Sequence, residues 1–407
     1  MLNRTVKAAV VVATGALALA ACGANKTESG ADGGGCDTSK GTVTVGVIAP
    51  LSGNLSAIGL GVRYSAQLAV DQANTKCAVK GYKVALDAED DQATPQIGAQ
   101  AATKLSTDPT VVGVVGTLNS SVAQTVQPVL QQKKVVMVSP ANTTPSLTKG
   151  TDPGNPKRQF DNYFRVCTTD DLQGPYAADY LVKKASKKNI AVIHDGKTYG
   201  RGLADAFTAQ ATKDGAKIVD QEQVGEKDVD FSGLLSKVQA TKPDAIYYGG
   251  EYAVAGPLSK QAAGLGITIP VMGGDGLYDQ KFIDLGGKEG DLATSVGAPT
   301  EKLQSAQDFV KAYTASKFPS EYGPDGAFAY DAANAIITSV AKTLGDNGRW
   351  GADQQDALLR NVGSYQAAGA TGNIAFDQYG DSTNKVLTVY QVTSGKWVPA
   401  QTGTFEG

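Results

Sequence analysis

Three polar segments of this sequence carry the residue types best suited to binding a small molecule. Residues 116–121 (GTLNSS, with Ser120 and Ser121) and 139–145 (SPANTTP) offer hydroxyl groups and backbone N–H groups, which bind an anion such as a carboxylate at a helix N-terminus. Residues 273–276 (GGDG) let a ligand approach the backbone and add the negative charge of Asp275. Donors in two segments and a carboxylate in the third suit a zwitterion.

The sequence gives little support for catalysis or for metal binding. The single histidine, His194, ends an apolar run, so an HExxH zinc site is impossible and a histidine-dependent triad would need this one residue. The motifs GxSxG, CxxC and GxGxxG do not occur. Gly196-Lys197-Thr198 resembles the end of a phosphate loop, but Ala191 occupies the place of its opening glycine. We therefore expect no enzyme, no metal and no cofactor.

The elements that must position these segments are alternating strands and helices. One series of short β-branched runs covers 42–49, 84–87, 111–115 and 135–138; after a polar loop at 148–160, a second covers 190–194, 218–223, 245–248 and 271–272. Helical patterns at 303–317, 327–344 and 354–361 and late strands at 374–376 and 386–392 follow. This rhythm predicts an α/β protein with two doubly wound lobes and a binding cleft at the carboxyl ends of the strands. Tyr199 and Glu251 also follow strands of the second series, so they are candidates for the cleft. Alternatively, Tyr199 is a residue of the core and Glu251 lies at the rim.

The N-terminus has the pattern of an export signal. Arg4 and Lys7 precede an apolar run at 8–21 that ends in small residues before Cys22. This junction resembles the lipobox of bacterial lipoproteins, which implies a signal peptide at 1–21 and a lipid on Cys22; the alternative is an ordinary signal with an incidental cysteine. The glycine-rich stretch that follows predicts a flexible tether at 22–39.

The composition and the number of cysteines further restrict the kind of protein that this chain can be. The chain has 407 residues, 42% of them hydrophobic, and a formal net charge of −3, which favours two globular domains and excludes a nucleic-acid-binding face. Three cysteines remain after Cys22. Cys36 precedes the first strand and Cys77 follows the antiparallel helix after it, so we favour a Cys36–Cys77 disulfide. Cys167 is expected to be a buried free thiol.

Several segments together resemble one family. They are VGVIAPLSG (45–53), GTLNSSVAQ (116–124), MVSPANTTPSLT (137–148), DDLQGPYAADY (170–180), IAVIHDGKTYGRGLA (190–204), DAIYYGG (244–250) and VMGGDG (271–276). In this order they are similar to the leucine/isoleucine/valine-binding solute receptors of ABC importers. The resemblance implies the type I periplasmic-binding-protein fold, with crossovers near Cys167, Pro299 and Asp377. Lobe 1 would comprise 40–166 and 299–376, and lobe 2 would comprise 167–298 and 377–407.

The resemblance also implies roles for individual residues. Ser120 and Thr143 would bind a ligand carboxylate, with help from backbone N–H groups. The carbonyl of Ala141 and the carboxylate of Asp275 would bind its ammonium group. Tyr199 would close over the ligand from lobe 2.

Two positions depart from the pattern of the branched-chain binders. Ile58 and Glu251 stand where those proteins carry aromatic residues that shape the side-chain pocket. A buried, unpaired carboxylate is costly beside an aliphatic ligand. Either Glu251 points to solvent, or the ligand has a polar or cationic side chain.

The function that the resemblance implies is capture of an amino acid outside the cell membrane. The receptor would be a lipid-anchored monomer that delivers its ligand to the membrane subunits of an ABC permease. The alternative is a receptor for an amide, a urea or a small carboxylic acid, which would have no use for the charge of Asp275. An extracellular hydrolase or dehydrogenase lacks its motifs, and a signalling ectodomain lacks a transmembrane helix after residue 21.

Overall fold

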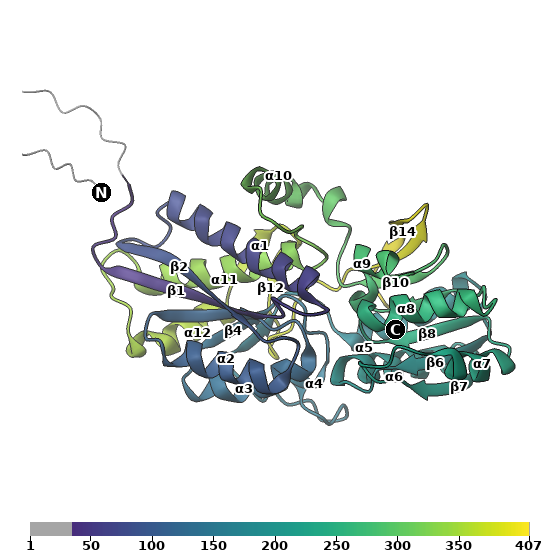
Figure 1. Ribbon diagram of the computed structural model, residues 1–407. Helices are drawn as coiled ribbons and strands as arrows, with labels where there is room; N and C mark the ends of the chain where they lie inside the picture. Colours follow the sequence, from purple (N-terminus) through teal and green to yellow (C-terminus); the bar gives the residue numbers. More distant parts are fainter. Residues whose placement is uncertain (1–34, 407) are drawn as a thin grey trace, which may run out of the picture. The chain divides into compact units, whose positions relative to one another are not determined.

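Two β-sheets, one in each of two lobes, form the framework of the protein (Figure 1). The computed structural model describes residues 35–406. The predicted signal peptide, the lipid site at Cys22 and most of the predicted tether lie outside these residues. The strands and helices below follow the alternation that the sequence predicts.

The first sheet has five parallel strands in the order β2-β1-β3-β4-β5. They are β1 (Gly41–Ala49), β2 (Tyr82–Asp90), β3 (Val111–Gly116), β4 (Val136–Ser139) and β5 (Tyr163–Arg165). Their valines and isoleucines are buried almost completely, as expected of a parallel sheet covered on both faces.

Helices cover both faces of the first sheet. Helix α1 (Ser56–Thr75) packs on α11 (Gly326–Leu344), and α2 (Pro95–Thr107) packs on α3 (Ser120–Gln132); Figure 1 shows α1 and the pair α2 and α3 on opposite sides of the strands. The lobe is completed by α4 (Ser146–Lys149), α10 (Gln307–Ser316), α12 (Gln355–Gly363) and the hairpin of β11 (Gln366–Gly369) and β12 (Gly372–Ala375). Helix α10 begins later than the predicted residue 303, because residues Gln304–Ala306 form a 3-10 turn.

The second sheet has seven strands in the order β14-β13-β10-β9-β8-β6-β7. The parallel part consists of β6 (Asn189–His194), β7 (Lys217–Gln223), β8 (Ala245–Gly249), β9 (Val271–Gly273) and β10 (Leu292–Ser295). The late strands β13 (Leu387–Thr393) and β14 (Lys396–Gly403) add to β10 as an antiparallel edge. Its helices are α5 (Asp170–Asp179), α6 (Thr198–Lys213), α7 (Ser232–Ala240), α8 (Tyr252–Gly264) and α9 (Gln280–Asp284).

The chain crosses between the sheets three times. It leaves the first sheet after β5, returns after β10 to build α10, α11 and α12, and crosses again after β12 to add β13 and β14 to the second sheet. Figure 1 shows the result in colour, since the light-green α11 lies among the purple and blue elements of the first lobe. Three crossovers fasten the lobes while leaving a shared border where a ligand can bind.

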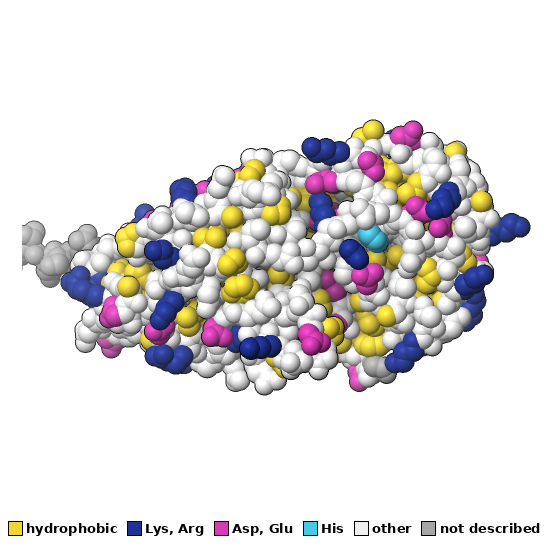
Figure 2. All heavy atoms as spheres, turned by 90° about the horizontal axis from the view of Figure 1, so that it is seen from below, with side chains coloured by type: hydrophobic (Ala, Val, Ile, Leu, Met, Phe, Trp, Pro, Cys, Tyr) yellow, Lys and Arg dark blue, Asp and Glu magenta, His cyan; other side chains and the backbone are white. Residues whose placement is uncertain are grey.

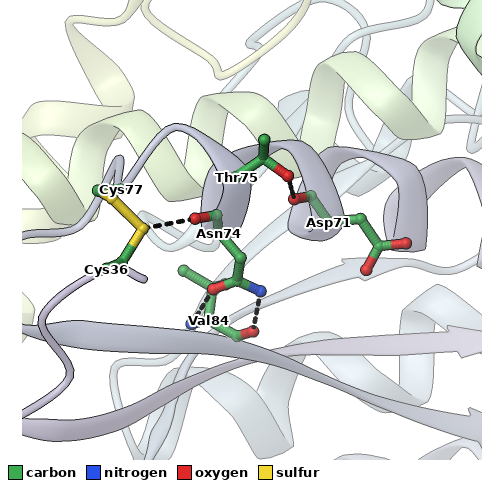
Figure 3. Close-up of a disulfide and its surroundings, with 6 residues drawn as sticks. All are labelled: Cys36, Asp71, Asn74, Thr75, Cys77 and Val84. Atoms are coloured by element: carbon green, nitrogen blue, oxygen red, sulfur yellow. Dashed lines mark hydrogen bonds between the residues drawn. A yellow bond between two sulfur atoms is a disulfide. The ribbon is translucent and has the colours of Figure 1, made fainter. Parts of the chain in front are cut away.

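A disulfide fastens the start of the first lobe. Cys36 and Cys77 are bonded, with their Cα atoms 5.3 Å apart, and Asn74 beside them pairs through its side-chain amide with the backbone of Val84 (Figure 3). The chain is therefore held against the lobe from Cys36 onward, earlier than residue 39, where the predicted tether ends. Cys167 is a buried free thiol.

None of the helices in residues 35–406 combines the length and the apolar character that crossing a membrane requires. His194 ends β6, and its Nδ1 accepts a hydrogen bond from the N–H of Gly196 at 3.0 Å. Burial lowers the pKa of His194. The residue caps a turn, which agrees with the structural role that its place in an apolar run indicates.

Candidate functional site

A cavity lies where the carboxyl ends of strands from both sheets meet. Its volume is about 30 Å³, below the usual range for small-molecule sites. The first lobe contributes Asn119, Ser120, Ala141 and Asp325, with apolar Leu55, Ile58 and Leu118 beside them. The second lobe contributes Tyr199, Glu251, Asp275 and Gly276.

Six of the eight ligand-binding residues expected from the sequence line this cavity: Ile58, Ser120, Ala141, Tyr199, Glu251 and Asp275. The other two do not. Ser121 follows Ser120 in α3 and is not part of the lining, and Thr143 is fully buried and is not part of it either. A one-residue step along a helix turns a side chain by about 100°, which directs Ser121 away from the side of α3 on which Ser120 lines the cavity.

Asp275 is held in place by two side chains of its own lobe. The Tyr199 hydroxyl donates to Asp275 Oδ1 at 2.7 Å, and Gln173 Nε2 donates to the same oxygen at 2.9 Å. Burial raises the pKa of Asp275, and these hydrogen bonds oppose the rise. Gly274 must be glycine here, because a Cβ atom would lie 2.4 Å from the Tyr199 hydroxyl oxygen.

Gln173 is a positioning residue that the sequence analysis did not assign. Its Oε1 accepts hydrogen bonds from the N–H of Asp275 at 2.9 Å and from the Thr294 hydroxyl at 2.8 Å. The amide therefore has one orientation, with its NH₂ group aimed at the Asp275 carboxylate. Its segment, 170–180, was part of the family resemblance, but nothing local to the sequence connects it with Asp275.

Glu251 does not point to solvent, which was one of the two alternatives from the sequence. Its side chain is only 13% exposed, and Oε1 accepts a hydrogen bond from Asn119 Nδ2 at 2.5 Å. Oε2 lies 3.3 Å from Lys197 Nζ. Its charge is therefore compensated by a lysine of the protein itself, and a cationic ligand is not needed to explain it.

The first lobe presents hydrogen-bond donors to the cavity. Ser120 is the first residue of α3, and it is 1% exposed. Its hydroxyl makes no hydrogen bond with residues 35–406. The first N–H groups of a helix have no acceptor within it, and the helix dipole favours an anion there. This end of the cavity suits a carboxylate.

The loop that carries Ala141 is held in place by hydrogen bonds from a buried arginine. The buried Arg165 donates through Nη1 to the carbonyls of Asn142 at 2.8 Å and Thr144 at 2.9 Å. Asn142 in turn donates from Nδ2 to the Leu118 carbonyl at 2.8 Å. The two donor segments predicted from the sequence, residues 116–121 and 139–145, are therefore connected by a hydrogen bond.

Asp325 is a lining residue that sequence reasoning missed. It lies directly before α11 and is 6% exposed. Burial, and next the nearby charge of Asp275, raise the pKa of Asp325 well above its usual range. An aspartate before a helical pattern is common as an N-cap, so its type and place carried no signal for a binding role.

Three hydrogen bonds connect the lobes around the cavity. Besides Asn119 with Glu251, the Thr198 hydroxyl donates to Gln124 Oε1 at 3.0 Å, and the Tyr252 hydroxyl donates to the Asn54 carbonyl at 2.7 Å. These contacts join groups from the two lobes and depend on the lobes being close together.

In residues 35–406, no three His, Cys, Asp or Glu side chains are grouped so that they could hold a metal ion. On the face shown in Figure 2, acidic and basic side chains are mixed with apolar and uncharged ones. The chemistry to be explained is therefore that of the cavity.

Comparison with known proteins gives consistent similarities over most of the chain. A family described as "Periplasmic binding protein" matches residues 42–396. The Leu/Ile/Val-binding protein homolog 3 of Brucella melitensis is 33% identical over 88% of this chain and 93% of its own, and the Leu/Ile/Val-binding protein BraC3 of Rhizobium johnstonii is 33% identical over 88% and 94%.

Solved structures agree with these relatives. The leucine binding protein LivK of Thermotoga maritima superimposes with a TM-score of 0.77 at 28% identity, covering 88% of this chain and 98% of that one. The branched-chain amino acid transporter substrate binding protein LivJ of Streptococcus pneumoniae, in complex with isoleucine, gives 0.78 at 26% identity, covering 89% and 99%.

Proposed function

Because the chain belongs to the periplasmic binding protein family, we propose that it is an extracytoplasmic receptor that binds an amino acid in the cavity between its lobes and delivers it to an ABC permease. Its fold is the type I periplasmic-binding-protein fold, with two lobes and three crossovers. The family consists of substrate-binding receptors, so the chain is not an enzyme.

One observation carries the choice of an amino acid. The cavity has a carboxylate, Asp275, on the second lobe, and the N-terminus of α3 with the free Ser120 hydroxyl on the first. An α-amino acid has the complementary charges, a carboxylate for Ser120 and an ammonium for Asp275 and the Ala141 carbonyl. Only the closed arrangement of the lobes makes both sets of contacts, so the ligand stabilises closure. The permease would bind the closed form.

The experiment is calorimetry with the purified protein and the common L-amino acids. Each binder is then compared with its amine, which lacks the carboxylate, and with its carboxylic acid, which lacks the ammonium. We expect both analogues to bind far more weakly than the amino acid. A carboxylic acid, amide or urea that binds as tightly would favour the alternative receptor class.

Two variants test the residues. Ser120→Ala removes a hydrogen bond to a charged group, which is worth about 1.5–3 kcal/mol, so binding should weaken roughly ten- to a hundredfold. Asp275→Asn should cost more, because it leaves a buried ammonium without its counter-charge. Ser121→Ala is the matched control, since its side chain does not line the cavity. Unchanged affinity in both site variants would contradict the assignment.

Anchoring is the second part of the proposal and rests on the N-terminal sequence. Cleavage after residue 21 would make Cys22 the new N-terminus and the site of the lipid, and the following residues the link to the folded part. Cys22→Ala should move the protein from the membrane fraction to the soluble fraction of a bacterial host. A monomer is expected, and light scattering of the purified protein checks this.

A further inference from the structure

The cavity wall contains a carboxylate for which the protein provides no partner. Asp325 is 94% buried and lines the cavity. Its side chain does not cap α11 and accepts no hydrogen bond from residues 35–406. A buried carboxyl group without donors is costly to ionise, so the free protein has an acidic group without a partner at a defined place.

The other two carboxylates that line the cavity, those of Glu251 and Asp275, have partners. Glu251 is matched by Lys197 and by the amide of Asn119. Asp275 is held by the neutral donors Tyr199 and Gln173, and in the proposed function it takes the ligand's α-ammonium. No lysine, arginine or histidine of the described residues lines the cavity. After an α-amino acid has bound, Asp325 still has no partner.

Hydrogen-bond acceptors are also in excess. Asn119 lines the cavity, and its Oδ1 is buried without a donor. The ligand must therefore bring donors as well as positive charge. Leu55, Ile58 and Leu118 supply an apolar surface in the same cavity, which suits the methylene stem of a long side chain with a polar end.

We infer that Asp325 is a second anchor for positive charge, so that the receptor takes an L-amino acid whose side chain ends in an ammonium or guanidinium group in preference to a neutral amino acid of the same size. This inference rests on the proposed function. This specificity differs from that of a branched-chain receptor, because Asp325 favours a positively charged side chain over an uncharged one.

The test compares matched ligands by calorimetry. Lysine is paired with norleucine, and arginine with citrulline, because each pair has about the same length and differs in the side-chain charge. For the wild type we expect the cationic member to bind at least tenfold more tightly. Asp325→Asn should reduce the affinity for lysine and arginine about ten- to a hundredfold while leaving norleucine and citrulline unchanged or improved.

Two controls separate this role from others. Asp195→Asn replaces a buried carboxylate outside the cavity lining, and it should leave the ratio of lysine to norleucine affinity unchanged. Ligand-free Asp325→Asn should unfold at the same or a higher temperature, because it removes a buried acidic group that has no partner. A large loss of its unfolding temperature would show that Asp325 has a structural role and would overturn the inference.

The remaining outcomes are distinguishable. If neutral isosteres bind as tightly as cationic ligands, or if Asp325→Asn weakens both equally, the inference is wrong while the proposed function stands, since Asp275→Asn should still weaken every amino acid. If no amino acid binds to the wild type at all, the proposed function and this inference both fail.

Discussion

Arg165 and Asp381 form an ion pair in which both side chains are fully buried, with Arg165 Nε 2.7 Å from Asp381 Oδ1. Arg165 ends the last strand of the first sheet, and Asp381 lies in the third crossover. Burial by itself would raise the pKa of Asp381, but Arg165 holds it below the usual range. The pair connects the third crossover to β5. Arg165 also holds the loop that carries Ala141.

Breaking this pair should destabilise the protein strongly. Arg165→Met leaves the buried charge of Asp381 with only the more distant Lys149 Nζ, 3.5 Å from Oδ2, so the loss should approach the roughly 3–5 kcal/mol of a broken buried pair. The free energy of unfolding in urea measures the loss. Lys134→Met is the control, because its pair with Asp356 is solvent-exposed and such pairs contribute about 1 kcal/mol or less. Equal losses in the two variants would contradict the role given to Arg165.

The bond between Thr198 and Gln124 should contribute to ligand affinity. It joins the two lobes at 3.0 Å, and a neutral hydrogen bond is worth about 0.5–1.5 kcal/mol. Thr198→Val should therefore weaken binding about two- to tenfold in calorimetry without changing the ligand-free unfolding temperature. Thr103→Val, whose hydroxyl bonds only within α2, should leave affinity unchanged. A Thr198→Val protein with wild-type affinity would show that this bond is not part of closure.

Asp91 should make stability depend on pH. The residue is fully buried, its Oδ1 accepts one hydrogen bond from the N–H of Ala93 at 2.8 Å, and its Oδ2 accepts none. Burial raises its pKa from 3.8 to about 7. The folded state thus keeps a proton that the unfolded state releases, so the stability from this group is complete below pH 3.8 and is lost as the pH rises toward about 7.

Asp91→Asn removes this titration and keeps an acceptor for Ala93. Relative to the variant, the wild type should lose about 1.4 kcal/mol per pH unit between about pH 4 and 7. Urea unfolding at several pH values in this interval measures the difference. Asp346→Asn, on the surface, should give a nearly constant difference between about pH 5 and 7, because the pair with Lys80 lowers the pKa of Asp346 and places its titration below this interval. Parallel curves for the wild type and Asp91→Asn would contradict the burial argument.

The disulfide should stabilise the folded part by constraining the unfolded chain. Cys36 and Cys77 are separated by 41 positions, and closing such a loop contributes up to about 4 kcal/mol in the chain-entropy model. The double variant Cys36→Ser, Cys77→Ser should show this loss in urea unfolding. A reductant should lower the unfolding temperature of the wild type but not of the double variant, and an equal effect on both would point to another cause.

Part of the site could be predicted because strand ends are visible in a sequence. The runs before residues 116, 139 and 273 marked three strands, and parallel strands present their carboxyl ends at one edge, so Ser120, Ala141 and Asp275 were expected in one cleft. Ser121 and Thr143 belong to the same segments, but which side chain of a segment faces inward depends on the helix start and on the loop geometry.

The sequence by itself determined the alternation of strands and helices, the two lobes and the residues at their strand ends, because hydrophobic periodicity and chain order are local properties. Only the tertiary structure decided that Gln173 holds Asp275, that Lys197 and Asn119 satisfy Glu251, and that Asp325 is left without a partner. These relationships join residues of different segments, and in the case of Asn119 with Glu251 of different lobes. Burial and charge compensation are set by such neighbours, which are distant in the chain and meet only when the lobes pack.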